Sequence, residues 1–394
     1  MEIKAALLVF TASISEPRHA VALPIPGKPN RISSHRSLAT MAEGPTMIFG
    51  QKMLFAKAAL KTITVILVSI VTGPFRGQKG ASTLWRHVLY RALRVHRDPS
   101  TTVGQIPLAS TVDQYEAYMK RKSMDPDVVE FSNGAKVCWF GSWADETVVL
   151  WLHGGAYVSA ATPGHMTLVG SLIEKAASNK AKLSCCFLQY DLAPGAAYPT
   201  QLLQAVTALQ YLTQEAQIPL SRIVLVGDSA GGNLALGLMS HLSHPHTSLP
   251  IINSQDNFKG LLLISPWVSF DQSAACMVEN ADKDYLGKAR LKLASDKFMA
   301  GGEVDYYNTP LGAGADWWRG IRAQDVCILA GEDELFRDDI QSFVARLSVH
   351  NGSKTATLIA RGEAHDAPVL DANLGIFSGQ QKKAMDQWVL AHAV

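Results

Sequence analysis

The chain has 394 residues, of which 47% are hydrophobic and 18% are charged, so its length and composition allow a large buried core. Its net charge is only +2, but the charge is uneven: the first 97 residues carry 14 Lys and Arg against 3 Asp and Glu, and the remainder carries 22 against 31. Basic charge mixed with apolar residues favours a membrane surface as a partner. Because no recognised binding module accompanies this charge, the composition argues against nucleic acid.

Residues 1–45 are predicted to form a disordered or targeting tail, because Pro, Ser and Arg are scattered through them without a sustained hydrophobic period. The apolar run from Ala5 to Phe10 weakly matches a signal peptide, and the acid-poor stretch from Arg31 to Thr40 weakly matches a transit peptide. Translation that starts at Met41 is a further alternative.

Residues 46–116 are predicted to form a basic, apolar, helical segment. Within it, Met53 to Thr72 is apolar apart from Lys57 and Lys61, and its uninterrupted part is shorter than the roughly 20 apolar residues that span a bilayer. Three alternatives stay open: a cap helix over a substrate cleft, a membrane anchor or interfacial helix, and an ordinary core helix. Trp85 to Arg97 is predicted to be a basic amphipathic helix.

Residues 117–394 are predicted to form an α/β domain with a mostly parallel sheet flanked by helices. Asn133-Gly134 separates two short extended segments, as is typical of a hairpin. Helical stretches such as 201–217 alternate with the other apolar runs, which favours a doubly covered sheet. The segment from about 271 to 322 is predicted to be a cap insertion above the sheet. The predicted strands are 128–131, 136–140, 147–152, 183–190, 222–226, 260–265, 326–330 and 355–359.

The cysteines indicate a reducing compartment, because their number is odd and four of the five lie in apolar, strand-like contexts. We therefore expect buried free thiols and an intracellular protein, either cytoplasmic or associated with a membrane such as the endoplasmic reticulum, rather than a secreted one. No Cys or His spacing is typical of a metal site, and neither a metal nor another cofactor is expected. The cysteines are Cys138, Cys185, Cys186, Cys276 and Cys327.

The stretch from Gly227 to Gly231 has the pattern G-x-S-x-G between a predicted strand and a predicted helix. In such an elbow the turn is so sharp that the neighbours of the serine must lack side chains, while the hydroxyl projects at a helix N-terminus. Ser229 is therefore the candidate nucleophile. The alternative is a glycine-rich turn without catalytic meaning.

Two adjacent glycines, Gly154 and Gly155, follow His153 directly after the predicted strand 147–152. Such a turn can point backbone N–H groups at one spot, as a developing oxyanion requires. The N–H groups of Gly154, Gly155 and Ala230 are therefore predicted to form an oxyanion hole. A simple tight turn is the alternative.

A serine nucleophile needs a general base, and the base needs an orienting carboxylate. His365 follows the last predicted strand, and Asp333 follows the strand before it, so the chain order is Ser, Asp, His. Asp333 is the preferred acid. Its competitors are Glu332, Glu334 and Asp338, and each acid could equally be a solvated surface group.

From about Ala117 onward the chain resembles α/β-hydrolases of the hormone-sensitive-lipase type, and most resembles the fungal branch of steryl acetyl hydrolase-like proteins. Two departures are Ala156, where many relatives have a third glycine, and Ala364-His365-Asp366, which replaces a His-Gly-Phe surround. The resemblance rests on His153 to Tyr157, Tyr190 to Pro194, Tyr198-Pro199, Gly227 to Asn233, Ser265 to Trp267, Asp333 and His365, and on Gly73 to Gly77 in the cap region.

The motifs and the resemblance together predict a serine hydrolase that cleaves a carboxylic ester, with Ser229, His365 and Asp333 as its triad. A small acyl group such as acetyl on a bulky apolar alcohol is what the resemblance implies. One alternative is a related enzyme of a fungal secondary-metabolite pathway that deacylates, transfers or cyclises its substrate. A ligand-binding receptor that has lost catalysis is the minor alternative, against which His365 argues.

Overall fold

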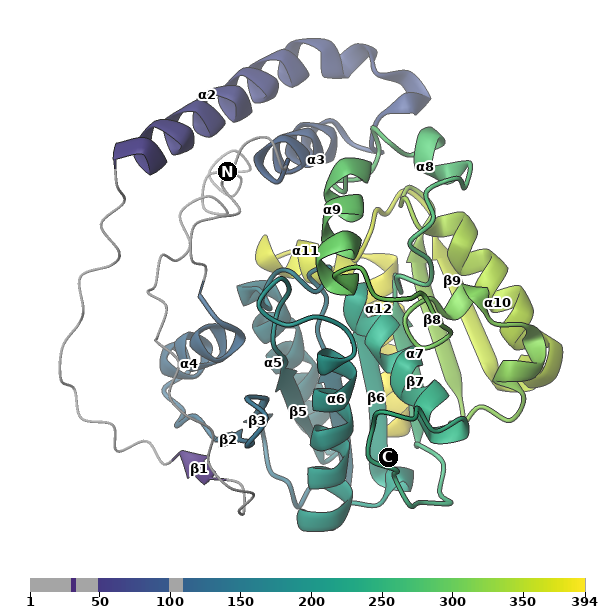
Figure 1. Ribbon diagram of the computed structural model, residues 1–394. Helices are drawn as coiled ribbons and strands as arrows, with labels where there is room; N and C mark the ends of the chain where they lie inside the picture. The colour runs from purple at the N-terminus through teal and green to yellow at the C-terminus, as the bar shows by residue number, and fades with distance from the viewer. Residues whose placement is uncertain (1–29, 33–48, 99–108, 394) are drawn as a thin grey trace.

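The computed structural model describes residues 30–32, 49–98 and 109–393, and its centre is a sheet of nine strands (Figure 1). The strand order is β1-β2-β3-β5-β4-β6-β7-β8-β9. The first three strands pair antiparallel, and the six strands from β5 to β9 in this order pair parallel. The strands are β1 Asn30–Ile32, β2 Val128–Glu130, β3 Lys136–Phe140, β4 Thr147–Leu152, β5 Leu183–Gln189, β6 Ile223–Asp228, β7 Gly260–Ile264, β8 Val326–Gly331 and β9 Thr355–Ala360.

Helices cover both faces of the sheet, which confirms the predicted α/β class. Helices α4, α5 and α12 pack with one face, and α6, α7 and α10 pack with the other. The helices are α2 Phe49–Thr72, α3 Leu84–His96, α4 Thr111–Arg121, α5 Pro163–Ser178, α6 Thr200–Gln210, α7 Ala230–Ser243, α8 Cys276–Glu279, α9 Lys288–Met299, α10 Arg337–Asn351, α11 Ala367–Asn373 and α12 Gln380–His392.

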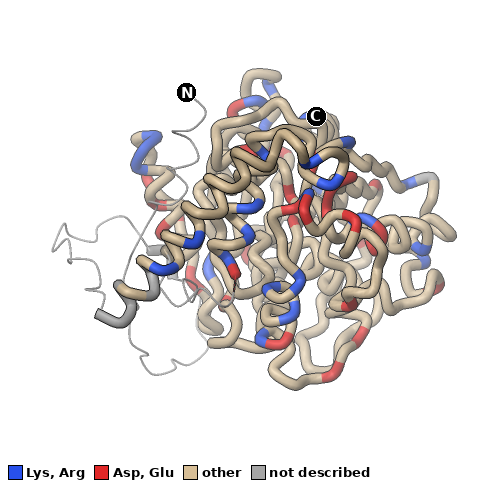
Figure 2. Tube along the Cα trace, turned by 90° about the horizontal axis from the view of Figure 1, so that it is seen from above, with Lys and Arg blue, Asp and Glu red and all other residues tan. Residues whose placement is uncertain are grey.

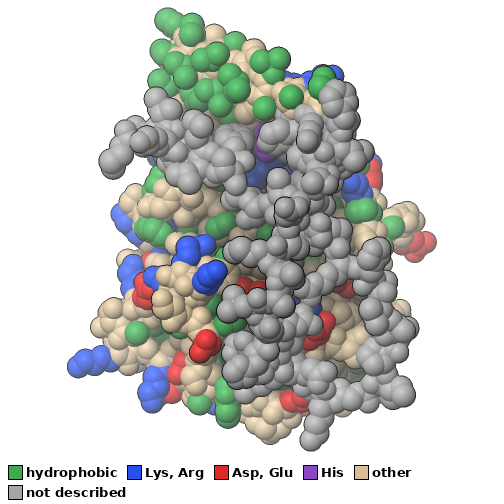
Figure 3. Space-filling view, turned by 90° about the vertical axis from the view of Figure 1, so that its left-hand side faces the viewer, with side chains coloured by type: hydrophobic (Ala, Val, Ile, Leu, Met, Phe, Trp, Pro, Cys, Tyr) green, Lys and Arg blue, Asp and Glu red, His purple; other side chains and the backbone are tan. Residues whose placement is uncertain are grey.

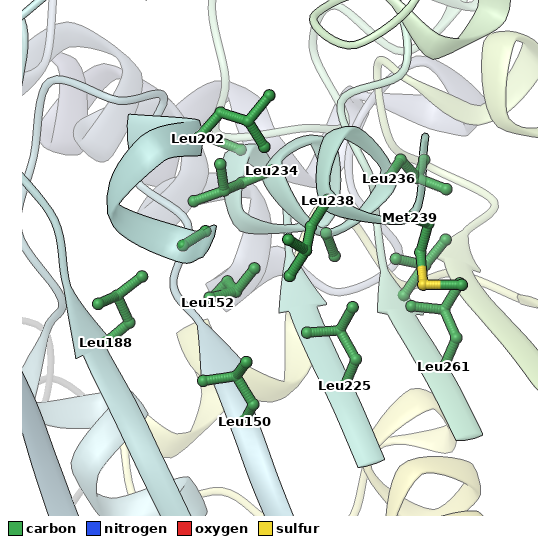
Figure 4. Close-up of a cluster of buried hydrophobic side chains, with 14 of the residues drawn as sticks. Leu150, Leu152, Leu188, Leu202, Leu225, Leu234, Leu236, Leu238, Met239 and Leu261 are labelled. Atoms are coloured by element: carbon green, nitrogen blue, oxygen red, sulfur yellow. The ribbon is translucent and has the colours of Figure 1, made fainter. Parts of the chain in front are cut away.

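The central strands are apolar at most positions because both of their faces are buried. Successive side chains of a strand point to opposite faces. Leu225 of β6 therefore joins the leucines of α7 on one face (Figure 4), whereas Val224 and Val226 join the core under α5 and α12. This is the reason that these strands appear in the sequence as continuous apolar runs rather than as alternating ones.

The hairpin prediction is confirmed, whereas the predicted division between residues 116 and 117 cuts through a helix. Gly134 has a φ of 86° between β2 and β3, which pair antiparallel. The division at 116/117 falls inside α4, whose Tyr115 is fully buried and donates its hydroxyl to the carbonyl of Trp139 at 2.6 Å. Helix α4 therefore belongs to the catalytic domain. Of the tail 1–45, β1 forms a strand on β2, and the rest lies outside the described residues.

The predicted insertion lies over the ends of the strands that carry the candidate site (Figure 1). It contains α8 and α9, and Phe298 of α9 stacks on Tyr157, with ring centroids 3.8 Å apart. The insertion therefore covers the loop that follows β4. The helix predicted over 201–217 is shorter, because α6 ends at Gln210 and continues as a π-helical turn to Glu215.

Helix α2 lies on the outside of α3, and both helices contain Lys and Arg but no Asp or Glu (Figures 1 and 2). Helix α3 itself packs against the insertion and α11 through a cluster that includes Tyr90, Tyr285 and Leu370. Among its described side chains, α2 buries only small ones: Ala58, Thr62 and Ser69. Leu67 and Val71 are 60% and 71% exposed, and apolar side chains gather at this end of the molecule (Figure 3). The core-helix alternative is therefore wrong.

All five cysteines are buried free thiols, as predicted. Burial raises the pKa of Cys327 to about 12, so that thiol is protonated at neutral pH. Cys276 differs from the other four, since it begins α8 rather than lying in a strand.

Candidate active site

Ser229 lies at the sharp turn between β6 and α7, as the G-x-S-x-G pattern predicts. Its φ of 52° and ψ of −116° are unusual for a residue with a side chain, and such strain is typical of functional turns. A Cβ atom on Gly227 would overlap the carbonyl of Gly231, and one on Gly231 would overlap the carbonyl of Leu152. The two glycines are therefore required by the close approach of backbone to backbone.

His365 reaches Ser229 from a loop 136 residues later in the chain. Its Nε2 atom lies 2.8 Å from the Ser229 hydroxyl oxygen, and its side chain is 2% exposed. Burial lowers the pKa of His365 to about 3, with Asp228 opposing this shift and the positive charge of Arg97 adding to it. The imidazole is therefore neutral at pH 7 and can accept the serine proton.

The structure does not bring the carboxylate of Asp333 to His365. The Asp333 N–H donates to the carbonyl of Glu363 at 2.9 Å, so the two loops lie side by side. The carboxylate, however, lies 3.5 Å from Nζ of Lys283, and Nδ1 of His365 has no hydrogen-bond partner among the described residues. Burial raises the pKa of Asp333, which Lys283 counteracts. The predicted Asp–His hydrogen bond is absent from this arrangement of the described residues.

Glu334, a competitor for the same role, is buried completely beside the His365 loop. Its Oε2 atom accepts hydrogen bonds from the Ser265 hydroxyl at 2.6 Å and from the Gly331 N–H at 2.9 Å. The Ser265 hydroxyl oxygen in turn accepts the N–H of Asp366 at 3.0 Å, next to His365. The Oε1 atom of Glu334 has no partner within the described part of the chain, and burial raises the pKa of this carboxyl to about 8.

The two remaining acid candidates have other contacts. Glu332 accepts the N–H of Gly362 at 3.2 Å. Asp338 pairs with Arg337 at 2.8 Å and accepts the N–H of Cys276, also at 2.8 Å. Glu332 is exposed and Asp338 is paired with an arginine, so the two buried acids, Asp333 and Glu334, remain the candidates for the orienting role.

The oxyanion prediction needs one correction, at Gly154. The N–H of Gly154 donates to Oδ2 of Asp228 at 2.7 Å, so it is not available to an oxyanion in this arrangement. Gly155 has a φ of 119°, and a Cβ there would overlap the carbonyl of Ser159. Ala230 is the first residue of α7, where N–H groups have no acceptor within the helix. The amides of Gly155 and Ala230 therefore remain the candidate donors.

Asp228 holds the oxyanion loop in place, a role that was not predicted. Besides the Gly154 N–H, it accepts hydrogen bonds from Nε1 of Trp151 at 2.8 Å and pairs with Nε2 of His165 at 3.1 Å. Burial raises the pKa of Asp228, but His165 and the hydrogen bonds outweigh it and keep the carboxyl ionised. The signal in the sequence was a charged residue at the end of an apolar strand, which needs buried partners.

Asp366 completes a cluster with Asp228 and His165 behind the nucleophile. Burial, and then the negative charge of Asp228, raise the pKa of Asp366 well above its ordinary value. A protonated Asp366 can donate a hydrogen bond to Asp228, so the two carboxyls share one proton. Ligand atoms of the three side chains lie within 4.8 Å of one another, close enough to surround a cation. The Asp228 oxygens, however, already accept hydrogen bonds from Trp151 and Gly154.

Comparisons with known proteins point to one family. The model of the family described as alpha/beta hydrolase fold matches residues 149–368, more than half of the chain. An acetyl-hydrolase of Streptomyces hygroscopicus is 28% identical over 158 residues, which are 40% of this chain and 48% of that protein. A protein of Schizosaccharomyces pombe, named by prediction a steryl acetyl hydrolase, is 25% identical over 265 residues, or 63% of this chain and 66% of that protein. The chain thus spans about half to two thirds of these relatives.

Solved structures show the same fold. An esterase/lipase from an uncultured bacterium has a TM-score of 0.57 and 20% identity, with 78% of this chain and 98% of that one covered. A carboxyl esterase from the mycorrhizal fungus Tuber melanosporum has a TM-score of 0.55 and 19% identity, with coverage of 66% and 82%. With its nucleophile elbow, its parallel sheet and its family match, this chain belongs to the alpha/beta hydrolase fold family, as a member of the hormone-sensitive-lipase type.

Proposed function

We propose that this protein hydrolyses carboxylic esters without a cofactor, with Ser229 as nucleophile and His365 as general base. The distance of 2.8 Å between the Ser229 hydroxyl and Nε2 of His365 is the observation that carries this proposal. His365 removes the serine proton as the hydroxyl attacks the ester carbonyl, and then returns it to the leaving alcohol. Water attacks the acyl-enzyme in the second half of the reaction, with His365 again as the base.

The negative charge on the carbonyl oxygen falls to the N–H groups of Gly155 and Ala230. The position of Ala230 at the start of α7 supports this, because the helix dipole also favours negative charge there. Removal of one such donor in other hydrolases lowers turnover about 10²- to 10³-fold. The acid that orients His365 is either Asp333 or Glu334. Asp333 takes this role if its carboxylate moves away from Lys283, and Glu334 takes it if Asp333 keeps that contact.

The substrate proposed is a small acyl ester, such as an acetate, of a bulky apolar alcohol. Its support is the names of two relatives, one an acetyl-hydrolase and one a predicted steryl acetyl hydrolase.

A fluorophosphonate probe tests the proposal directly, because it labels only an activated serine. We expect the unmodified protein to be labelled and to hydrolyse 4-nitrophenyl acetate, and Ser229→Ala to lose both properties. Ser178→Ala is the matched control, since Ser178 is an exposed serine on α5. Labelling of Ser229→Ala at the rate of the unmodified protein would remove Ser229 from the role.

We also propose that α2 binds a membrane. Residues Ala56–Phe75 are long and apolar enough to cross a bilayer or to lie in its interface. The exposed leucine and valine side chains of α2, beside the basic residues of α2 and α3, support contact with lipid. Flotation with phosphatidylcholine/phosphatidylserine vesicles tests this. A protein that remains at the bottom of the gradient would contradict it.

A further inference from the structure

Two arginines from distant parts of the chain meet beside the candidate active site. Nη1 of Arg290, on α9, donates to the carbonyl of Arg97 at 3.2 Å, and its Nη2 donates to the Ser159 hydroxyl at 3.2 Å. Ser159 N–H donates to the carbonyl of Gly155 at 3.0 Å. Arg290 is thus held against the loop that carries a candidate oxyanion donor.

Arg97 lies on the His365 side of the same site. Its guanidinium carbon is 5.2 Å from the ring centroid of Tyr285, and that ring is 6.0 Å from the ring of His365. Its positive charge is close enough to His365 to help lower the pKa of the imidazole. The charge of Arg97 therefore acts on the general base, while Arg290 is held against the loop of the oxyanion donor.

These two positive charges have no carboxylate partner within the described part of the chain. Three other partly buried arginines have one, since Arg86 pairs with Asp371, Arg94 with Asp282 and Arg337 with Glu279. Others, such as Arg322, donate instead to backbone carbonyls. Asp366 also feels the charge of Arg97, but burial first, and then Asp228, raise the pKa of Asp366, so that this carboxyl is protonated and uncharged. Asp98 directly follows Arg97 and has an interaction of its own, and the segment 99–108 after it contains no Asp or Glu.

Keeping two arginines together without a counter-charge is unfavourable, and the pKa of Arg290 reflects this. Burial first, and then the charge of Arg97, lower it to about 10. A guanidinium group has five N–H donors. Arg290 uses two of its N–H groups for the bonds above, and the Arg97 guanidinium donates none to the described residues. Within the described part of the chain, three N–H groups of Arg290 and those of the Arg97 guanidinium thus have no acceptor, and we take these groups as the donors for an anion.

We propose that Arg97 and Arg290 bind a carboxylate group of the substrate, so that the ester cleaved by Ser229 also carries a free carboxylate near the scissile bond. This inference rests on the proposed ester hydrolysis. Planar guanidinium groups match the two oxygens of a carboxylate, and a partly buried site strengthens the charge-assisted hydrogen bonds. A phosphate offers the same chemistry, so the experiment includes one.

Binding to the Ser229→Ala protein separates this inference from the catalytic proposal, because no turnover is needed. The probes are 4-acetoxybenzoate, its neutral amide 4-acetoxybenzamide, and 4-acetoxyphenyl phosphate, with affinity measured by calorimetry. We expect the carboxylate to bind at least about 10-fold tighter than the amide, since a hydrogen bond to a charged group is worth that much. Equal affinity, or no binding of either, would overturn the inference. Preference for the phosphate over the carboxylate would overturn the assignment to a carboxylate.

Substitution of the arginines in the same Ser229→Ala background shows whether they cause the preference. Arg97→Gln and Arg290→Gln should each reduce the ratio of carboxylate to amide affinity about 10- to 100-fold. Lys292→Gln is the matched control, because Lys292 is an exposed cation on the same helix as Arg290 and pairs with Asp296. If Arg290→Gln fails to fold, Arg97→Gln decides, because its guanidinium group forms no hydrogen bond with the described residues. An unchanged ratio in Arg97→Gln would sink the proposal.

If the unmodified protein hydrolyses no ester while Ser229→Ala still prefers the carboxylate, the catalytic proposal fails and the anion site stands. If neutral esters are hydrolysed and the charged ones are not preferred, the catalytic proposal stands and the anion site fails.

Discussion

Helices α7 and α2 are equally apolar in sequence but have opposite surroundings. Every residue of α7 from Ala230 to Leu242 is buried, because the helix lies on the sheet directly after the nucleophile. Helix α2 buries small side chains against α3 and exposes its large ones, such as Leu60 and Leu67. The two helices thus have the same apolar composition, but only α7 is covered by a sheet. The exposed face of α2 requires a different apolar partner.

The largest effect is expected inside the buried region, at the acid that orients His365. If Asp333 has this role, Asp333→Asn should lower kcat/KM about 10⁴-fold, as loss of the orienting acid does in other triads. If Glu334 has it, Glu334→Gln should cause that loss, and Asp333→Asn should cost little. Kinetics on 4-nitrophenyl acetate decides between them, with Asp296→Asn as control, because Asp296 is an exposed residue of α9. Loss of activity in neither variant would mean that His365 works without an orienting carboxylate.

The second largest difference between the two regions is expected in how well each tolerates an added methyl group. Gly231→Ala should lower the free energy of unfolding by about 4 kcal/mol or prevent folding, because its Cβ would overlap the Leu152 backbone. Gly77→Ala, in the link between α2 and α3, has no atom within 4 Å of the added Cβ, so only its φ of 55° opposes the change. Its cost should be about 1 kcal/mol. Urea unfolding measures both, and similar costs would show that the α2 layer is packed as tightly as the sheet.

Truncation of a large apolar side chain should give a smaller difference in the free energy of unfolding between the same two regions. Leu225→Ala should cost about 3 kcal/mol, because Leu225 is fully buried in the core under α7. Leu67→Ala should change stability by less than about 0.5 kcal/mol, because Leu67 is 60% exposed. The double variant Leu67→Glu/Val71→Glu should instead lose vesicle binding while it keeps hydrolysis of soluble esters. Retained flotation of that double variant would contradict the lipid contact.

The smallest expected effect is in the pH profile. A folded-state pKa of about 3 for His365, against an ordinary 6.5, places the acid limb of kcat/KM well below pH 6.5. The same depressed pKa contributes stability above pH 6.5 that is lost as the pH falls toward 3, since protonation then favours the unfolded chain. Arg97→Gln should move the acid limb upward, because its charge helps to lower the pKa. An acid limb at or above pH 6.5 in the unmodified protein would contradict the buried, neutral imidazole.

Much of the site could be predicted because its key residues sit in motifs whose geometry is local. The elbow around Ser229 needs Gly227 and Gly231 for steric reasons that the pentapeptide itself contains. His365 was found from chain order alone, and the structure brings its Nε2 atom to the serine hydroxyl. Asp333 was chosen by the same reasoning. The direction of its side chain, however, depends on residues far away in the sequence, because Lys283 of the insertion contacts its carboxylate.

The pairings between distant residues could not be predicted. Arg97 and Arg290 are 193 positions apart, and neither lies in a recognised motif. The prediction for Gly154 failed because Asp228, 74 residues later, takes its N–H. Such contacts depend on where separate elements dock, and no periodicity in one segment records the side chains of another.

The amino-acid sequence alone determined the α/β class, eight of the nine described strands and the nucleophile, because periodicity and turn sterics act over a few neighbouring residues. The tertiary structure alone decided which backbone N–H groups remain for an oxyanion and which acid can reach His365. It also decided that α7 is covered while α2 is exposed, and that Arg97 lies beside Arg290. These outcomes depend on burial and on distances between elements, and burial changes both the pKa of a group and the partners that remain open to it.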